Sequence, residues 1–254
     1  MSISYIPFNF PGLSSVRCVF QTRPGGSGQG EYGGGNISFS VGDEAAHVAD
    51  NRRSLLASLK TQGMSQWAEL VQVHGDVMAF EPQPVACDAL PAEEGDGMAT
   101  DRPGLGLLIK TADCQPVLLA HRSGRYVAAM HAGWRGNRCD FPLTGVVRFC
   151  EHYDLRPQDV FAVRGPSLGP GMAEFVNFDR EWGAQFRPWF DEESRTMDLW
   201  SLTRHQLMLA GLPARNIFGL DICTASNNEQ FFSYRRAKAS GRQASMIWIQ
   251  SSRS

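Results

Sequence analysis

Three apolar segments follow one another between residues 105 and 131, and they constrain the fold of this chain more than any other feature. LGLLIK (105–110), PVLLAH (116–121) and RYVAAMH (125–131) are separated only by short breaks. Short apolar runs bounded by turn residues are typical of buried strands. We therefore expect neighbouring strands in a central sheet, with His131 at the end of the third strand.

Strand and helix patterns alternate without a strict order in the rest of the chain. This irregular alternation, with long strand runs and interspersed helices, favours an α+β fold whose sheets are covered by helices. A hairpin is expected where 77–80 returns on 68–73, and a long irregular connection over 81–104. Strands are predicted at 16–22, 68–73, 77–80, 160–165, 216–222 and 244–249, and helices at 44–63, 143–153, 179–187 and 201–210, the last capped by Ser201.

A glycine-rich loop raises the question of a dinucleotide cofactor. Gly28, Gly30 and Gly33 match the G-x-G-x-x-G spacing. That fingerprint requires a helix immediately afterwards, whose N-terminus faces the pyrophosphate. Here NISFSVGD (36–43) follows, and it alternates like a strand. The match therefore does not predict a nucleotide cofactor.

Composition excludes several classes of protein. The 254 residues are 43% hydrophobic, enough for one large domain, and the formal net charge of −2 does not favour a nucleic-acid partner. No apolar run approaches the roughly 18 residues of a membrane span, and the N-terminus has no signal-peptide pattern. Without a C-x-x-C pair, the six cysteines are expected to be thiols. We expect a cytoplasmic protein that binds neither nucleic acid nor membrane, and a monomer because no heptad pattern requires a partner.

Three side chains are candidate metal ligands because each lies where a predicted strand ends. His74 follows the strand at 68–73, Cys114 lies in the break between two strands, and His131 ends the third apolar segment. Two imidazoles and a thiolate suit zinc, and three protein ligands leave a fourth position for water, as in catalytic zinc sites. Their spacing matches no zinc-finger template. The residues alone also leave open a Cys114 nucleophile with His131 as base, or a binding module with a structural zinc.

Several motifs together resemble one known family, the YfiH family, also called the laccase-domain or peptidoglycan editing factor family. The resemblance covers nearly the whole chain. It is carried by QVHG (72–75), TADCQPVLL (111–119), HAGWRG (131–136), FFSYRR (231–236) and GRQAS (241–245), with TRPGG (22–26), Asn36, VGD (41–43) and NR (51–52) in the N-terminal part.

The resemblance implies a fold, a metal site and a set of activities. The fold is a single α+β domain over residues 1–254, with packed mixed β-sheets flanked by helices, and the metal is zinc bound by His74, Cys114 and His131. Family members are described as enzymes for phosphorolysis of adenosine, inosine, guanosine or methylthioadenosine, and for adenosine deamination. Others are described as polyphenol oxidases, or as factors that remove wrong amino acids from muropeptide precursors.

Two stretches depart from the family pattern. In GPSLGP (165–170), Ser167 stands where a cysteine is often found, and NRCDFPLTG (137–145) replaces a smaller, more alanine-rich helix start. Neither stretch contains a predicted metal ligand. Both are expected to affect the shape of the pocket and the choice of substrate.

Phosphorolysis requires cationic groups that hold phosphate. Guanidinium groups match phosphate oxygens, so Arg52, Arg135 and Arg235 are the candidates, each with a structural ion pair as the alternative. Arg53 and Arg236 are expected to face solvent.

Other polar and aromatic residues are assigned by their place in the motifs. Asp113 is a candidate general acid or base, or orients a ligand histidine. Gln72 shares the predicted strand face of His74 and is a candidate hydrogen-bond partner for a base or ribose. Asn36 reaches a ligand or makes a turn, and Trp134 stacks on a purine or packs in the core.

Copper is a less suitable metal than zinc for this set of residues. A blue-copper centre adds a weak axial methionine, and Met130 is expected to point to the opposite strand face from His131. The four remaining histidines are scattered, with no H-x-H pair for a multicopper cluster.

The predicted function is a zinc-dependent purine nucleoside enzyme that acts by phosphorolysis and by adenosine deamination. Its substrates are small molecules, a purine nucleoside and phosphate. The main alternative is a peptidoglycan editing hydrolase that releases a wrong amino acid from muropeptide precursors, and the second is a copper polyphenol oxidase.

Overall fold

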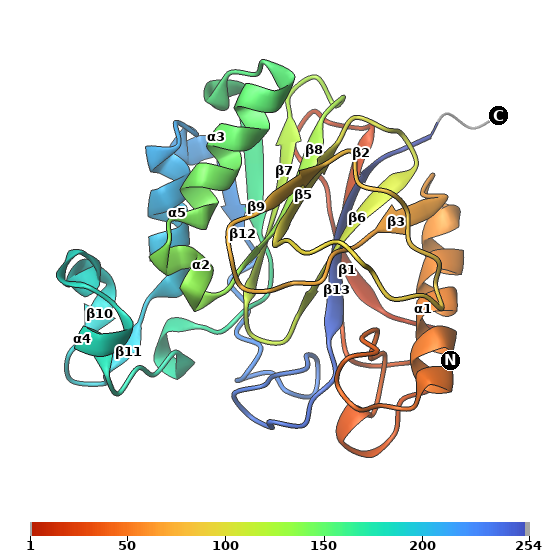
Figure 1. The fold of residues 1–254 in the computed structure, drawn as a ribbon, viewed down its shortest axis with the longest axis horizontal. Helices are drawn as coiled ribbons and strands as arrows, with labels where there is room; N and C mark the ends of the chain where they lie inside the picture. The colour runs from red at the N-terminus through yellow and green to blue at the C-terminus, as the bar shows by residue number, and fades with distance from the viewer. Residues whose placement is uncertain (1, 252–254) are drawn as a thin grey trace.

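Two β-sheets face each other in the computed structural model, which describes residues 2–251 (Figure 1). The first sheet has the order β1 (Tyr5–Phe8), β2 (Val16–Gln21), β13 (Gln243–Ile249), β6 (Leu105–Thr111) and β3 (Gln66–Ala68). The second has the order β12 (Ile217–Gly219), β9 (Val160–Arg164), β7 (Gln115–His121), β8 (Val127–Ala132), β5 (Gly97–Thr100) and β4 (Met78–Phe80). Both are mixed, because β3–β6, β12–β9 and β4–β5 are parallel and the other pairs are antiparallel.

Strand alternation divides the apolar side chains between two layers. On β6, Leu107 and Ile109 lie in the layer between the sheets, together with Val127 and Ala129 of β8. Leu108 points the other way and packs in the layer outside the first sheet. Each strand therefore places hydrophobic residues on both faces, which explains why the central strands are nearly continuous apolar runs.

Helices cover the two outer faces. Helix α1 (Ala45–Lys60) packs Leu55 and Leu59, four residues apart, on the first sheet. Helix α3 (Phe141–Tyr153) packs Val146 and Phe149 on the second sheet, beside Leu207 of α5 (Leu199–Leu209). Figure 1 shows α1 on one side of the sheets and α3 and α5 on the other. The predicted α+β fold of packed mixed sheets flanked by helices is confirmed.

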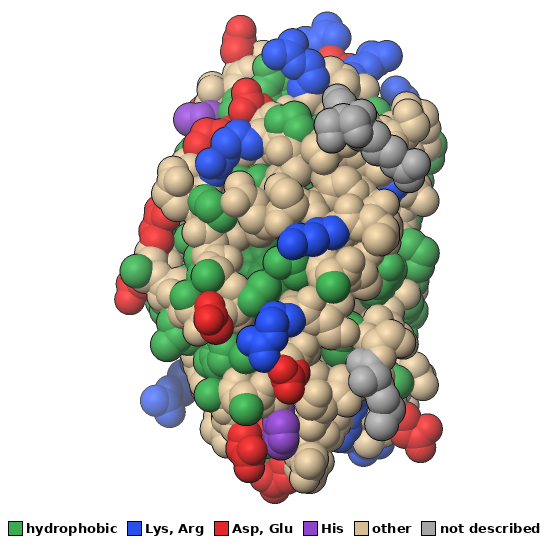
Figure 2. Space-filling model, turned by 90° about the vertical axis from the view of Figure 1, so that its right-hand side faces the viewer, with side chains coloured by type: hydrophobic (Ala, Val, Ile, Leu, Met, Phe, Trp, Pro, Cys, Tyr) green, Lys and Arg blue, Asp and Glu red, His purple; other side chains and the backbone are tan. Residues whose placement is uncertain are grey.

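The solvent face of α1 carries both signs of charge. Exposed Arg53 forms an ion pair with Asp50 one turn away. Lys and Arg side chains are interspersed with Asp and Glu over this side of the molecule (Figure 2). Within residues 2–251, no helix has the length and apolar character needed to cross a bilayer.

A small subdomain joins β9 to α5. It contains the short helix α4 (Phe178–Glu181), the 3-10 turns Pro170–Met172 and Ala184–Trp189, and a hairpin of β10 (Phe190–Asp191) and β11 (Thr196–Met197). Its apolar cluster includes Phe175, Trp182 and Phe186, and packs against Trp134 of α2 (Trp134–Arg138). Further 3-10 turns lie at Gly30–Tyr32, Pro157–Asp159 and Ala214–Asn216.

The strand predicted at 68–73 and its hairpin pairing with 77–80 are wrong, whereas the strand at 77–80 is present as β4. Strand β3 ends at Ala68, and beyond it only Val71 makes an isolated bridge. A side chain replaces the backbone hydrogen bonds of a strand pair here. The amide of Gln72 donates to the Lys110 carbonyl and accepts the Lys110 N–H. Strand β4 pairs in parallel with β5 in the other sheet, so 77–80 is not the return of a hairpin.

Four other local predictions also need correction. Residues 81–104 are not irregular throughout, because they contain strand β5. Residues 36–43 are not a strand. No α-helix follows the glycine loop until Ala45, so the helix that a dinucleotide fingerprint requires directly after its glycines is absent. The helix predicted at 179–187 is broken at Gly183 into α4 and a 3-10 turn. Helix α5 is capped by Asp198, whose carboxylate accepts the Ser201 N–H at 2.9 Å, and not by Ser201.

Candidate metal centre and cavity

A cavity of about 800 Å³ lies where strand ends and loops of both sheets meet. Its wall includes the β6–β7 connection, the end of β8 with the start of α2, and parts of the loops 71–74, 167–175 and 234–242. These segments gather at the lower end of the view in Figure 1. The volume is within the range of small-molecule sites.

The structure brings His74, Cys114 and His131 together in this cavity. Each offers a ligand atom within 4.8 Å of the other two, and the two imidazole rings are 4.8 Å apart at 77°. Bonds of about 2.0–2.3 Å in a tetrahedral zinc site separate ligand atoms by about 3.3–3.6 Å. Small side-chain rotations would therefore close the three residues on one ion. Among residues 2–251, no other group of three His, Cys, Asp or Glu side chains has this proximity.

The three ligands come from different kinds of local structure. His131 is buried in β8, and Cys114 lies in the turn between β6 and β7. His74 lies in a loop, partly exposed, with a left-handed backbone (φ 62°) that is uncommon for a residue other than glycine. The sequence had suggested that strand alternation places His74 in the cluster, but a loop places it there.

Cys114 and His131 shift each other's pKa in opposite directions. Burial alone would raise the pKa of the Cys114 thiol, but charge and hydrogen bonds from His131 and His74 lower it to about 6. Burial alone would lower the pKa of His131, but Cys114 and Asp96 raise it to about 9. A thiolate near neutral pH is the form that binds metal.

Asp96, which the sequence did not single out, contacts both histidine-bearing segments. Its fully buried carboxylate lies 2.7 Å from His131 Nδ1 and accepts the backbone N–H groups of His74 at 3.0 Å and Gly75 at 2.7 Å. Burial would raise the pKa of Asp96, but these contacts outweigh it and lower that pKa. Acidic residues are common over 88–101, so the sequence offers no signal that distinguishes this one.

Gly133 gives the cluster room. A Cβ at this position would lie 2.9 Å from Cys114 Sγ and 3.1 Å from His74 Cδ2. Met130 points away from the site, because its sulfur packs against Gly145 of α3. The expected separation of Met130 from His131 is present in the structure.

Basic side chains surround the cavity, and some have no acidic partner. Lys110 pairs with Glu69 at 2.9 Å, and Arg235 donates to the Glu174 carbonyl at 3.3 Å. In the part of the chain that the structure describes, no carboxylate is within ion-pair distance of Arg135, Lys238 or Arg242. Arg242, within the GRQAS motif, is a further residue that the sequence reasoning did not select.

Two predicted substrate residues lie outside the cavity wall. Arg52 is 1% exposed and forms a bidentate pair with Glu69, and its remaining donors reach the carbonyls of Ile37 and Cys87. The side chain of Asn36 is fully buried and bonds Ser38, Asp43 and the backbone of Arg242. Each side chain is enclosed by protein groups, so the structure does not bring either one to the cavity wall.

The other predicted polar residues line the cavity but hold its loops in place. Both oxygens of Asp113 are used, by the Thr224 hydroxyl at 2.7 Å and the Arg235 backbone N–H at 2.6 Å. Asp113 therefore does not orient a ligand histidine, and Asp96 makes that contact. Gln72 bonds Lys110 through both ends of its amide.

Aromatic side chains, called here the aromatic wall, line part of the same cavity as the His74–Cys114–His131 cluster. Trp134 and Phe175 both line it, with ring centroids 5.7 Å apart, and Trp134 also contacts Trp182. Arg135 lies over the Trp134 ring at 4.6 Å. Ser167 is held deeper in the wall, where its hydroxyl oxygen accepts from Trp200 Nε1 at 2.8 Å and Gln115 Nε2 at 3.0 Å.

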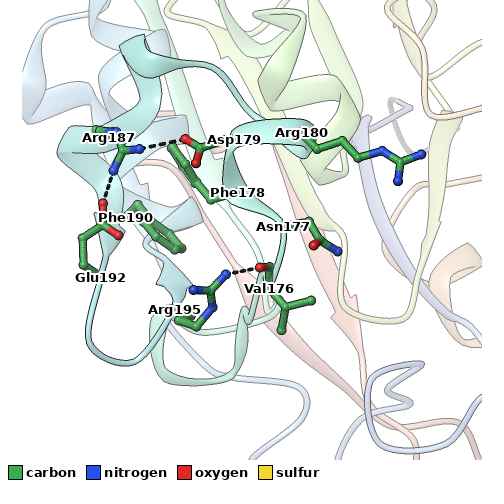
Figure 3. A pocket seen from close by; sticks show the side chains of 9 residues that line it. All are labelled: Val176, Asn177, Phe178, Asp179, Arg180, Arg187, Phe190, Glu192 and Arg195. Carbon is green, nitrogen blue, oxygen red and sulfur yellow. Dashed lines mark hydrogen bonds and ion pairs between the residues drawn. The ribbon is translucent and has the colours of Figure 1, made fainter.

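A second, smaller hollow of about 270 Å³ lies on the 176–195 segment (Figure 3). Arg187 pairs with Asp179 and Glu192, and Arg195 donates to the Val176 carbonyl. Most of its charged groups are thus satisfied by one another, and no metal cluster lies here. The larger cavity is the candidate functional site.

Comparison with known proteins places the chain among a group of relatives of similar length. Residues 17–250 match the family described as multi-copper polyphenol oxidoreductase laccase. A protein of Escherichia coli (strain K12) named purine nucleoside phosphorylase YfiH is 35% identical, covering 98% of this chain and 100% of that protein. A purine nucleoside phosphorylase of Haemophilus influenzae is 34% identical, covering 93% of this chain and 95% of that protein.

Solved structures agree on the fold. YlmD from Geobacillus stearothermophilus has a TM-score of 0.81 at 27% identity, covering 95% of this chain and 94% of that chain. A Neisseria meningitidis protein has a TM-score of 0.81 at 29% identity, covering 97% of this chain and 99% of that chain.

Proposed function

This chain belongs to the multi-copper polyphenol oxidoreductase laccase family, and from that premise we propose that it is a zinc-dependent purine nucleoside phosphorylase that also deaminates adenosine. The observation that carries the proposal is the presence of two features in one cavity. A cluster of two histidines and a cysteine lies beside arginines that have no acidic partner. The relatives named purine nucleoside phosphorylase support this substrate class.

Zinc fits the donor set better than copper. Two imidazole nitrogens and a thiolate are common zinc ligands, and three protein ligands leave an open position. The Met130 sulfur is directed into the layer around α3, so it is not available as the axial ligand of a blue-copper centre. When bound, zinc would supply Lewis acidity and lower the pKa of a bound water to about 7.

Arg135 and Arg242 are the proposed phosphate-binding residues. Both line the cavity, and Arg242 uses one nitrogen for the carbonyls of Ser240 and Gly241, which fixes its guanidinium while other N–H groups remain. In phosphorolysis, a phosphate oxygen forms a bond to C1′ as the C1′–N9 bond breaks, giving ribose 1-phosphate and the free purine. Two guanidinium groups would hold the incoming phosphate dianion in place, and its proton would pass to N9 of the leaving purine.

The purine is proposed to lie on the aromatic wall. Trp134 and Phe175 present ring surface to the cavity, and their mutual contact keeps them fixed. Base–aromatic stacking tolerates different purines, because each has a π-face. This arrangement supports a site that accepts more than one nucleoside.

Deamination uses the same site with water in place of phosphate. Water adds at C6 of adenosine, and ammonia leaves to give inosine. Zinc held by His74, Cys114 and His131 would supply an activated water for this second activity. Lys238 lies over the Tyr234 ring at the cavity and adds positive charge there.

The test is to incubate zinc-loaded protein with adenosine and with inosine, each with and without phosphate. Phosphate-dependent ribose 1-phosphate supports phosphorolysis, and inosine formed from adenosine without phosphate supports deamination. Full activity after complete removal of metal would point instead to Cys114 as a nucleophile. Release of an amino acid from muropeptide precursors, with no turnover of nucleosides, would replace this proposal with the editing hydrolase.

A further inference from the structure

Asp96 contacts two of the three metal-binding segments at once, and we infer that it is a positioning residue that preassembles the metal site. This inference rests on the proposed metal site but not on the identity of the substrate. Asp96 directly precedes β5, at the end of the strand nearest the cavity. Its carboxylate is fully buried and lies between β8 and the loop that carries His74.

On the β8 side, Asp96 orients the His131 ring. Its Oδ1 lies 2.7 Å from His131 Nδ1, and its backbone carbonyl accepts the His131 N–H at 2.7 Å. A proton on Nδ1 that faces a carboxylate leaves Nε2 as the ligand atom. The side chain and the backbone of Asp96 thus fix both the ring and the strand that carries it.

On the loop side, Asp96 holds the turn around His74. Oδ1 accepts the His74 N–H at 3.0 Å, and Oδ2 accepts the N–H groups of Gly75 at 2.7 Å and Val73 at 3.2 Å. His74 adopts a left-handed backbone, which costs free energy and persists only where surrounding contacts determine it. Three N–H bonds to one carboxylate provide that determination.

No other described carboxylate performs this task. Asp113, although next to Cys114, uses both oxygens on Thr224 and Arg235. Asp96 alone connects the strand ligand and the loop ligand, so the spacing of His74 and His131 is set before any ion arrives.

Glu81 offers a matched control at the opposite end of β5. Its carboxylate accepts the Thr100 hydroxyl at 2.6 Å and the Asp101 N–H at 3.0 Å, and it contacts Tyr153 and Arg102. It organises a loop at the other end of the same strand as Asp96, but touches no member of the cluster. Loss of its charge tests general destabilisation without touching the metal site.

The experiment compares zinc affinity in Asp96→Asn and Glu81→Gln by competition with a chromophoric chelator, with thermal unfolding measured in parallel. An amide cannot accept both from His131 and from all three loop N–H groups. We expect zinc affinity to fall 10- to 100-fold in Asp96→Asn and to stay at the wild-type level in Glu81→Gln. Wild-type affinity in Asp96→Asn, or an equal fall in both variants, overturns the inference.

A measurement on the wild-type protein covers the case in which Asp96→Asn does not fold. In the metal-free protein, the amides of His74 and Gly75 should be protected from hydrogen exchange, because Asp96 accepts both. Exchange of these amides at the rate of an unstructured peptide would overturn the inference. Neither experiment involves a nucleoside, so a failure of the proposed reaction leaves their results intact.

Discussion

The floor and the rim of the cavity are built in different ways. The metal floor, made of His74, Asp96, Cys114 and His131, pairs every charge with another charge or with backbone N–H groups. The cationic rim, made of Arg135, Lys238 and Arg242, gathers like charges that have no carboxylate partner among residues 2–251. The floor is organised by the protein itself, whereas the rim becomes neutral only when an anion binds.

The largest effect is expected when the floor loses its thiolate. Cys114→Ser should lose tightly bound zinc, because a hydroxyl is a poor zinc ligand near neutral pH. Losing several kcal/mol of charge stabilisation corresponds to a fall in kcat/KM on the order of 10³-fold. Metal content and steady-state kinetics check this, with Cys139→Ser, at an exposed thiol outside the cluster, as the control. Wild-type activity and zinc content in Cys114→Ser would show that the metal floor does not take part in catalysis.

A smaller effect is expected when the rim loses one cation. A hydrogen bond to a charged group contributes about 1.5–3 kcal/mol, so Arg242→Gln should raise KM for phosphate about 10- to 100-fold. Zinc content and KM for the nucleoside should not change, because Arg242 is not a metal ligand. The control is Arg53→Gln, on the exposed face of α1. If Arg242→Gln loses zinc instead, floor and rim are not independent.

Adding a methyl group beside the cluster tests how closely His74, Cys114 and His131 must approach one another. The backbone of Gly133 (φ −73°, ψ 171°) accepts alanine, but its Cβ would lie 2.9 Å from Cys114 Sγ. Overpacking of this kind costs about 1–3 kcal/mol, so Gly133→Ala should lower zinc affinity about tenfold. A Cβ at Gly75 would meet Asp96 at an ordinary 3.6 Å, so Gly75→Ala should bind zinc normally. Equal zinc affinities in Gly133→Ala and Gly75→Ala would contradict the expected crowding of the cluster by a Cβ at position 133.

The smallest effect concerns the pH dependence of Cys114 in the metal-free protein. Its pKa is lowered to about 6, so the thiolate is present above pH 6 and is lost as the pH falls through that value. Alkylation by iodoacetamide should therefore be nearly constant from pH 7 to 9. Partial desolvation and the nearby charge of Asp76 raise the pKa of the exposed Cys139, whose alkylation should rise about tenfold per pH unit.

The difference between the two rates at pH 7 is modest, because a thiolate of low pKa is a weaker nucleophile. The pH profile is therefore the readout, followed by mass spectrometry of the two peptides. Parallel pH profiles for Cys114 and Cys139 would mean that His131 and His74 do not lower the pKa of Cys114.

The three candidate metal ligands show how far local patterns reach. Cys114 and His131 were recognised because they lie at the ends of apolar strands, and those strands exist. His74 was selected on the premise of a strand that is absent, and it reaches the cluster through a left-handed loop held by Asp96. The resemblance to the YfiH family is confirmed by the relatives and the solved structures, and it depended on motifs rather than on geometry.

The arginines show where sequence reasoning ends. Arg52 and Arg242 both lie in family motifs, and nothing in the order of residues distinguishes them. Arg52 is enclosed with Glu69, whereas Arg242 reaches the cavity wall. A guanidinium that is buried beside a carboxylate stabilises the fold, and one without such a partner is available to an anion.

By itself, the sequence determined the central apolar strands and the covering helices, because hydrophobic patterns are local, and its family motifs pointed to packed sheets and to three candidate metal ligands. Only the tertiary structure decided which carboxylate contacts the His74–Cys114–His131 cluster and which cations line the cavity. Those roles depend on burial and on partners up to 35 residues away, as for Asp96 and His131, and such partners meet only after the sheets have packed.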